Sequence, residues 1–161
     1  MRAYKFIWVV LVVGAVLPLF FFPKAGFAQA PQVAQKSLPD ASIAPYFIQL
    51  PSKYSVEKKY PLFIAVHWHT GTAQQQLDEW KFLTNKSGYI LLCPQFSDGY
   101  QELSSREDEA LIKIIEATKS DYSVDASKIF LVGNSGGAQF VHRFDLPPNK
   151  WTQRRVGIIL N

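Results

Sequence analysis

The sequence predicts an α/β fold whose mostly parallel sheet is covered by helices on both faces. Short, continuously apolar runs recur along the chain, and segments of ten or more residues with helical character separate them. Strands that are apolar throughout are typical of parallel sheets buried on both sides, and the helices between them supply the crossover connections. With 161 residues, 48% of them hydrophobic, the chain is long enough for one domain with a real core.

Five apolar, β-prone runs are the predicted strands. They are residues 46–50, 61–67, 89–93, 128–132 and 156–160. The last run closes the sequence without a helix to cover it, so the predicted sheet is incomplete on its C-terminal side.

Three segments are predicted to be helical. Residues 72–88 carry apolar side chains at roughly helical spacing and have Gly88 at the C-terminal end. Residues 105–122 start with Ser105 as a candidate cap, place acids in the first turn and continue with an apolar stripe. A short third helix is expected to end near residue 144, because a pair of prolines follows.

The first 28 residues have the layout of a secretory signal peptide. A basic start precedes an almost unbroken apolar run at 6–22, and small residues follow. Cleavage is expected after Ala28, because cutting after Ala30 would leave a proline as the first residue. An uncleaved membrane anchor at 6–22 is the alternative, although that run is near the lower length limit for a span.

On either alternative the globular part is predicted to be exported, to the periplasm or outside the cell. Residues 29–44 are polar and small without periodicity, so they are interpreted as a linker, and residues 45–161 as a partial α/β domain. Contact with a membrane is expected only through the N-terminal segment, if it stays uncleaved.

The charge balance argues against a nucleic-acid partner. The formal net charge is +4, but three of the 17 basic residues and none of the 13 acidic ones lie in the first 28 residues. The predicted mature chain is thus nearly neutral and lacks a basic excess for binding phosphates. The single cysteine, Cys93, lies in an apolar run, where a buried core thiol is expected rather than a reactive one.

Residues Gly133-Asn134-Ser135-Gly136-Gly137 match the pattern G-x-S-x-G between a predicted strand and a predicted helix. In a sharp turn of this kind the serine has strained backbone angles, and its neighbours two residues away lack bulky Cβ groups. The turn lifts Oγ clear of the sheet and aims the N–H of Gly136 at a developing oxyanion. Ser135 is therefore the predicted nucleophile, and a plain glycine-rich loop is the alternative.

Together with this turn, the stretches PLFIAVHWHTGT at 61–72 and SVDASKIFLVGNSGGAQFVHRF at 123–144 resemble secreted α/β-hydrolases, most closely the esterase and polyhydroxybutyrate-depolymerase-like group. The resemblance covers about residues 45–144 and looks like the N-terminal two-thirds of such enzymes. It implies a fold in which the strand ending at His67 lies beside the strand ending at Gly133. The implied substrate is a small-molecule or polymeric ester, and no cofactor is expected.

The resemblance also implies a second oxyanion donor, from the turn that follows His67. That turn typically reads His-Gly-x in the family, whereas this sequence has Trp68 in place of the glycine. A tryptophan restricts the backbone and fills space, so the donor is expected to be the N–H of Trp68 or of His69. No metal is expected at this turn, because the two histidines point to opposite sides of a continuing strand and have no third ligand.

A serine hydroxyl needs a base to remove its proton, and this fold supplies it in the order Ser, then Asp or Glu, then His. After Ser135 the sequence has one histidine, His142, and then one carboxylate, Asp145, which is the reverse order. His142 lies two helical turns from Ser135, about 10 Å along a helix axis, and is predicted not to reach the hydroxyl. His67 or His69 as a substitute base is the other alternative, but the sequence offers no carboxylate to orient either.

The sequence supports two functional hypotheses. The first is an exported serine ester hydrolase whose triad acid and histidine are missing from these 161 residues, so that the chain is truncated and inactive by itself. The second is a non-catalytic exported α/β protein, either a decayed hydrolase or a binding module. A prolyl-oligopeptidase-type peptidase shares the serine turn but needs a propeller domain, for which this sequence has no room.

Overall fold

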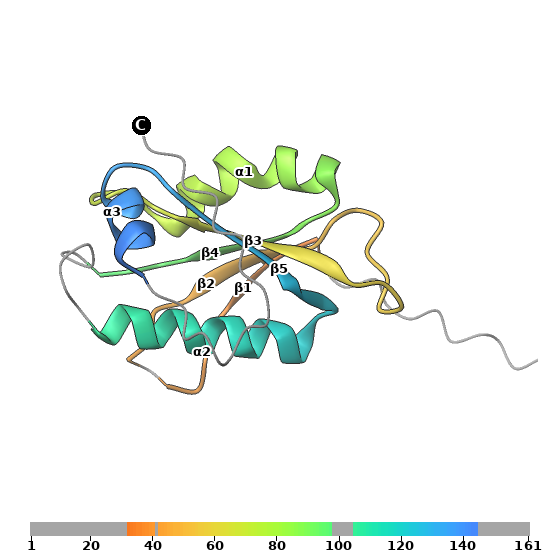
Figure 1. Cartoon of the computed structure of the whole chain (residues 1–161), viewed down its shortest axis with the longest axis horizontal. Coiled ribbons are helices and arrows are strands. Elements are labelled where there is room, and N and C mark those ends of the chain that lie inside the picture. Colours follow the sequence, from red (N-terminus) through yellow and green to blue (C-terminus); the bar gives the residue numbers. More distant parts are fainter. Residues whose placement is uncertain (1–31, 41, 98–104, 145–161) are drawn as a thin grey trace, which may run out of the picture.

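The computed structural model describes residues 32–40, 42–97 and 105–144. Within these ranges the strands form one sheet in the order β1-β2-β4-β3-β5 (Figure 1). They are β1 (Val33–Lys36), β2 (Tyr46–Gln49), β3 (Tyr60–Val66), β4 (Ile90–Pro94) and β5 (Val124–Gly133). The helices are α1 (Ala73–Ser87), α2 (Ser105–Asp121) and α3 (Gly136–Arg143).

The strands β3, β4 and β5 run parallel, as predicted. Helix α1 connects the neighbouring strands β3 and β4, and α2 connects β4 to β5, which lies on the other side of β3. Both connections are crossovers of the kind that parallel strands need. Strands β1 and β2 extend the sheet in antiparallel pairing, consistent with the helix-free connection between them.

The predicted linker over 29–44 is wrong at 33–36, where β1 pairs with β2. The residues of β1 alternate between exposed and half-buried, so this edge strand carries little of the apolar signal that marks the others. Lys36 in β1 forms an ion pair with Asp121 at the end of α2. The folded domain therefore begins before the predicted boundary at 45.

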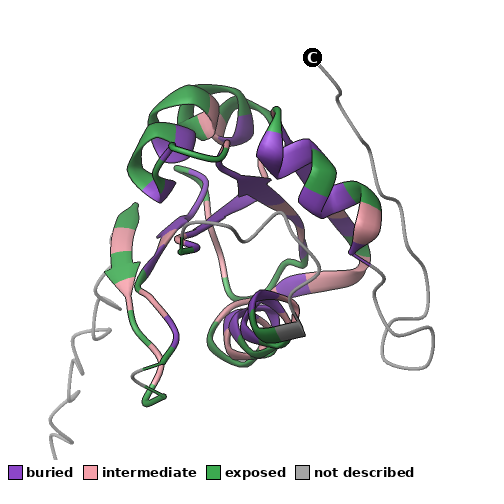
Figure 2. Cartoon of the chain, turned by 90° about the vertical axis from the view of Figure 1, so that its left-hand side faces the viewer, coloured by how far each residue is buried: buried purple, intermediate pink, exposed green. Residues whose placement is uncertain are grey.

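Helices cover both faces of the sheet, as the sequence predicts. Figure 1 shows α1 and α2 on opposite sides of the strands. The larger core lies between the sheet and the helices α2 and α3, and it includes Leu62, Ile64, Leu111, Ile114 and Phe140. The smaller core lies under α1 and comprises Ala65, Ala73, Leu77, Leu91, Cys93 and Val132. Figure 2 shows the central strands buried and the outer sides of the helices exposed.

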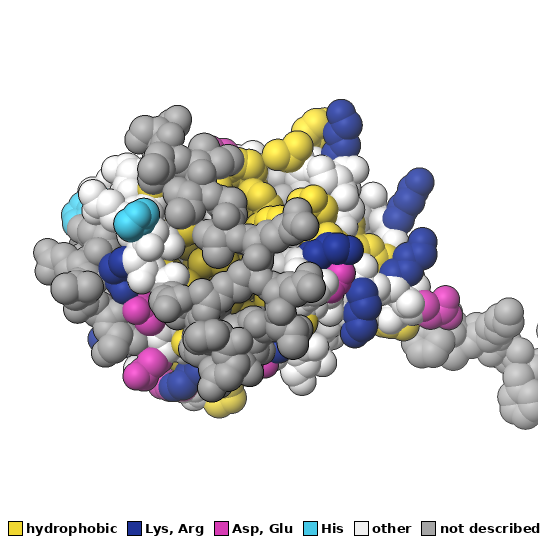
Figure 3. All heavy atoms as spheres, viewed as in Figure 1, with side chains coloured by type: hydrophobic (Ala, Val, Ile, Leu, Met, Phe, Trp, Pro, Cys, Tyr) yellow, Lys and Arg dark blue, Asp and Glu magenta, His cyan; other side chains and the backbone are white. Residues whose placement is uncertain are grey.

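Helix α1 begins and ends within one residue of the predicted range 72–88. Thr72 and Gln75 form a reciprocal capping box at its start, and Gly88 closes it in the left-handed region with φ 73°. On its outward side Phe82 and Leu83 are exposed, and Figure 3 shows hydrophobic side chains on this surface.

Several predictions from the sequence lie outside the described residues. They are the signal peptide or anchor at 1–28, the strand at 156–160 and the prolines that follow the third helix. Within the described ranges, no helix has the length and apolar character needed to cross a membrane.

Candidate active site

Ser135 lies in the tight turn between β5 and α3. Its backbone angles are φ 52° and ψ −117°, and it is the non-glycine residue with positive φ in the described ranges. Such angles cost an L-residue roughly 1–3 kcal/mol and are found mainly at functional sites. The residue is exposed, and although it occupies the N-cap position of α3 its side chain makes no capping hydrogen bond. A helix-capping role therefore does not explain the serine.

The glycines around Ser135 are required by close backbone packing. A Cβ on Gly133 would lie 2.3 Å from the carbonyl carbon and oxygen of Gly137. A Cβ on Gly137 would lie 2.4 Å from the carbonyl oxygen of Val66, at the end of β3. Neither position has room for a side chain, so the turn packs directly against the neighbouring parallel strand. This is the strained strand–turn–helix arrangement in which a G-x-S-x-G serine presents its hydroxyl.

The turn after β3 brings the backbone of His69 next to Gly136. A Cβ on Gly136 would lie 3.0 Å from the backbone nitrogen of His69 and 3.3 Å from its Cα and Cβ. Two of the three predicted oxyanion donors, the N–H groups of Gly136 and His69, therefore come from adjacent backbone segments.

Trp68 takes the place of the expected glycine without separating these two segments. Its indole lies against Gly71, where an added Cβ would be 2.8 Å from the ring. Its carbonyl oxygen accepts a hydrogen bond from the Gly71 N–H at 2.9 Å. The missing side chain at Gly71 thus provides the space that a tryptophan in this turn needs.

His67 is buried, with 1% of its surface exposed, and is hydrogen-bonded to backbone groups on two sides. Its Nε2 accepts from the N–H of Phe96 at 3.0 Å, and its Nδ1 lies 2.7 Å from the carbonyl oxygen of Trp68. Because Nε2 is an acceptor, the neutral ring carries its proton on Nδ1, and this N–H donates a hydrogen bond to the carbonyl oxygen of Trp68. Of the two interpretations of His67, this bonding favours a residue that organises the turn. It does not favour a substitute base for Ser135.

Sequence reasoning missed Gln95 and Phe96, which follow β4. The Nε2 of Gln95 lies 3.3 Å from Nε2 of His67, and its Oε1 accepts from the N–H of Ala73 at 2.8 Å. The ring of Phe96 packs 4.9 Å from that of Phe140 on α3. One signal was present in the sequence: both residues come directly after a predicted parallel strand, and the carboxyl ends of parallel strands share one edge of the sheet.

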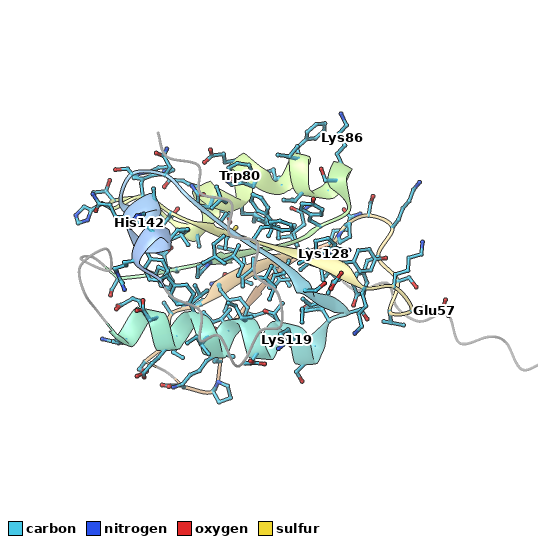
Figure 4. The ribbon with its side chains drawn as sticks, in the orientation of Figure 1. Glu57, Trp80, Lys86, Lys119, Lys128 and His142 are labelled. Carbon is cyan, nitrogen blue, oxygen red and sulfur yellow. The ribbon has the colours of Figure 1, made fainter. Side chains whose placement is uncertain are left out.

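Of the other candidate acids and bases, one lies far along α3, one lies beside the serine turn, and one falls outside the described residues. His142 is exposed on α3 (Figure 4), two helical turns after Ser135, or about 10 Å along the axis. His69 is exposed beside the turn, and Asp145 falls outside the described residues. In the described ranges no three His, Cys, Asp or Glu side chains are grouped so that they could hold a metal ion.

A cavity of about 290 Å³ opens between residues 42–44, residues 95–97 and the start of α2. Inside it the hydroxyl of Ser97 donates to the buried carboxylate of Glu107 at 2.9 Å. The described residues that line this cavity do not include Ser135, Gly136 or His69. We therefore do not assign it to the substrate.

The chain is similar in sequence and structure to known esterases, and no family model matches it. Over 109 residues it is 28% identical to the probable acetylxylan esterase A of Aspergillus fumigatus, a match that covers 60% of this chain and 29% of that protein. It resembles the acetyl xylan esterase from Aspergillus awamori with a TM-score of 0.58 and 21% identity, covering 69% of this chain and 45% of the other.

A poly(3-hydroxybutyrate) depolymerase from Bordetella parapertussis is similar with a TM-score of 0.57 and 18% identity, covering 73% of this chain and 49% of that one. These similarities confirm that the chain has the α/β-hydrolase fold and that it resembles esterases and depolymerases, as the sequence motifs predict. The matched part spans less than a third of the curated relative and about half of the solved structures.

Proposed function

We propose that this protein is an exported serine ester hydrolase in which Ser135 is the nucleophile. The observation that carries the proposal is the strained backbone of Ser135, with φ 52°, at an exposed position in the turn. The glycines at 133 and 137 in this turn leave no room for side chains. Strain of this kind persists only where the surrounding structure enforces it. A plain glycine-rich loop does not need a strained serine.

The chemistry follows from the atoms around this turn. Oγ of Ser135 attacks the carbonyl carbon of an ester, and the carbonyl oxygen becomes an oxyanion that accepts hydrogen bonds from the N–H groups of Gly136 and His69. The alcohol leaves with a proton, and water then hydrolyses the acyl-serine. We expect the histidine and carboxylate that move these protons to come from outside the described residues, because His67 is bonded to the backbone and His142 is distant.

The substrate class rests on similarity. The matched proteins are named as esterases of acetylated xylan and as a depolymerase of a polyester. We infer that this protein acts on small-molecule or polymeric esters outside the cytoplasm, after export through its N-terminal segment. Because the chain spans a fraction of these relatives, the product of the whole coding frame is the form to assay.

A covalent serine probe tests the nucleophile. The purified protein is treated with a fluorophosphonate, the labelled peptide is located by mass spectrometry, and hydrolysis of an aryl acetate is followed. We expect the label on Ser135 and expect Ser135→Ala to abolish it, with a loss of at least about 10³-fold in ester hydrolysis. Ser127→Ala is the matched control, because the Ser127 hydroxyl is bonded to Asp125 on β5, away from the turn.

The alternative is a non-catalytic exported α/β protein. It is favoured by one observation, that His67 and His142 are not placed to activate Ser135 within the described structure. Folded protein that neither takes the label nor hydrolyses the acetate would support this alternative and contradict the hydrolase. A coding frame that continues past Asn161 with an Asp and then a His would favour the hydrolase.

A further inference from the structure

We propose that His67 is a positioning residue for the oxyanion hole, because its Nδ1–H fixes the orientation of the peptide group between Trp68 and His69. The inference deepens the proposed function and rests on it. It assigns a role to a buried histidine that does not touch the substrate.

The geometry of one peptide group carries this proposal. In a trans peptide the carbonyl oxygen and the next N–H point in opposite directions, and the described residues contain no cis peptide. The carbonyl oxygen of Trp68 is held by Nδ1 of His67 at 2.7 Å and by the N–H of Gly71 at 2.9 Å. The N–H of His69 is therefore directed to the other side. Its nitrogen lies 3.0 Å from the Cβ position of Gly136, the residue that supplies the first donor.

The imidazole that holds this carbonyl is itself fixed by the segment after β4, which in turn packs against α3. Its Nε2 accepts the Phe96 N–H after β4, and the two rings lie 6.2 Å apart. Phe96 in turn packs against Phe140 on α3, the helix that follows Ser135. Donors that are fixed before the reaction stabilise an oxyanion without reorganisation, so a rigid His67 ring favours catalysis.

A purely structural role is the competing explanation, in which His67 only ties the β4 loop to the β3 loop through Phe96. The two explanations use different ring nitrogens, which allows them to be separated. Asparagine places an N–H donor near the position of Nδ1 and has no atom at Nε2. Glutamine places an acceptor oxygen near Nε2 and has no donor at Nδ1.

The test compares His67→Asn with His67→Gln in the full-length protein, by kcat and KM for aryl acetate hydrolysis. If His67 positions the peptide, we expect His67→Asn to stay within about 3-fold of wild type and His67→Gln to lose about 10–100-fold in kcat at unchanged KM. Equal losses in both variants, or better retention by His67→Gln, would overturn the proposal. His142→Asn and His142→Gln, on the exposed side of α3, are matched controls expected to behave like wild type.

An NMR measurement keeps the proposal testable if hydrolysis is absent or a variant fails to fold. In wild-type protein with ¹⁵N-labelled histidine, His67 is expected to be neutral with its proton on Nδ1, and the His69 amide signal is expected to shift in His67→Gln more than in His67→Asn. A proton on Nε2, or on both nitrogens at neutral pH, would overturn the inference. If Ser135 takes no label but His67 has its proton on Nδ1, the result would contradict the proposed function and not the position of the peptide group held by His67.

Discussion

Arg143 at the end of α3 is ion-paired with Asp108 in the first turn of α2. The Nη1 atom of Arg143 lies 2.8 and 2.9 Å from the two carboxylate oxygens, and the side chains are 16% and 30% exposed. The guanidinium also lies 4.8 Å from the centre of the Phe140 ring. This pair therefore holds the helix that follows Ser135 against its neighbour in the larger core.

Replacing Arg143 by methionine is expected to lower the free energy of unfolding by about 1–3 kcal/mol. The value lies between those of exposed and buried pairs, because the substitution leaves a half-buried carboxylate without its cation. Urea denaturation measures the change. Lys81→Met is the control: its pair with Asp78 is about half exposed on both sides, and its loss is expected to change the stability much less than the loss of Arg143 does. Equal effects in the two variants would contradict the role given to Arg143.

Alanine at Gly137 is expected to prevent normal packing of the serine turn. The added Cβ would meet the carbonyl oxygens of Val66 and His67 at 2.4 and 2.7 Å, and backbone atoms cannot rotate away. We expect a loss of about 3 kcal/mol or more, or failure to fold. Gly88→Ala is the comparison: φ is +73° there but nothing lies within 4 Å of the new Cβ, so about 1 kcal/mol is expected. A well-folded Gly137→Ala variant of near wild-type stability would contradict this packing.

The sheet and its order of elements could be predicted because each central strand is apolar and each long helix has end signals. Helix α1 is the best case, since Thr72 and Gly88 have the chemistry of a cap at each end. Strand β5 starts at Val124, whereas the sequence predicts a start at 128. The first residues of the strand were missed because they are mostly polar, and the pairing between β3 and β5 shifts register along them. Strand β1 was missed because an edge strand needs few apolar side chains.

The candidate site could be predicted only as far as local sequence determines it. The turn around Ser135 is one continuous stretch, so its glycine pattern indicates its geometry. The choice between Trp68 and His69 as the second donor depends on which way the peptide group between these two residues faces. That orientation is set by His67, whose ring is held by Phe96 from another strand. Such contacts between distant residues leave no periodic signal.

The thiol of Cys93 is expected to be unreactive in the folded protein. It is buried in the smaller core, and burial raises its pKa, so the reactive thiolate is scarce at neutral pH. With a disulfide reagent at pH 8 we expect no reaction until the protein is unfolded in urea, and then one thiol per chain. Ser120→Cys, on the exposed side of α2, supplies a thiol that should react at once. Fast reaction of Cys93 in folded protein would contradict its burial.

The carboxylate of Asp40 is expected to make stability depend on pH in the acid range. Hydrogen bonds from Ser42, together with the ammonium group of Lys113 on α2, lower the pKa of Asp40 to about 2. Because an unfolded aspartate has a pKa of about 3.9, the stabilisation is present above that value and is lost as the pH falls from about 4 towards 2. Asp40→Asn should therefore be less stable than wild type at pH 5, and the difference should shrink by pH 2. A difference that stays constant over this range would exclude Asp40 as its source.

Replacing Ser135 by glycine is expected to stabilise the protein while removing its proposed nucleophile. Glycine adopts φ 52° and ψ −117° without the steric penalty that Ser135 bears, although its greater freedom in the unfolded chain offsets part of the gain. Against Ser135→Ala, which keeps the Cβ and the strain, we expect Ser135→Gly to have a free energy of unfolding about 1 kcal/mol higher. Ala117→Gly, inside α2, makes the same exchange of alanine for glycine in a regular helix and should instead lose about 1 kcal/mol. Urea denaturation of these variants decides the matter, because a Ser135→Gly variant no more stable than Ser135→Ala would mean that the turn stores no strain.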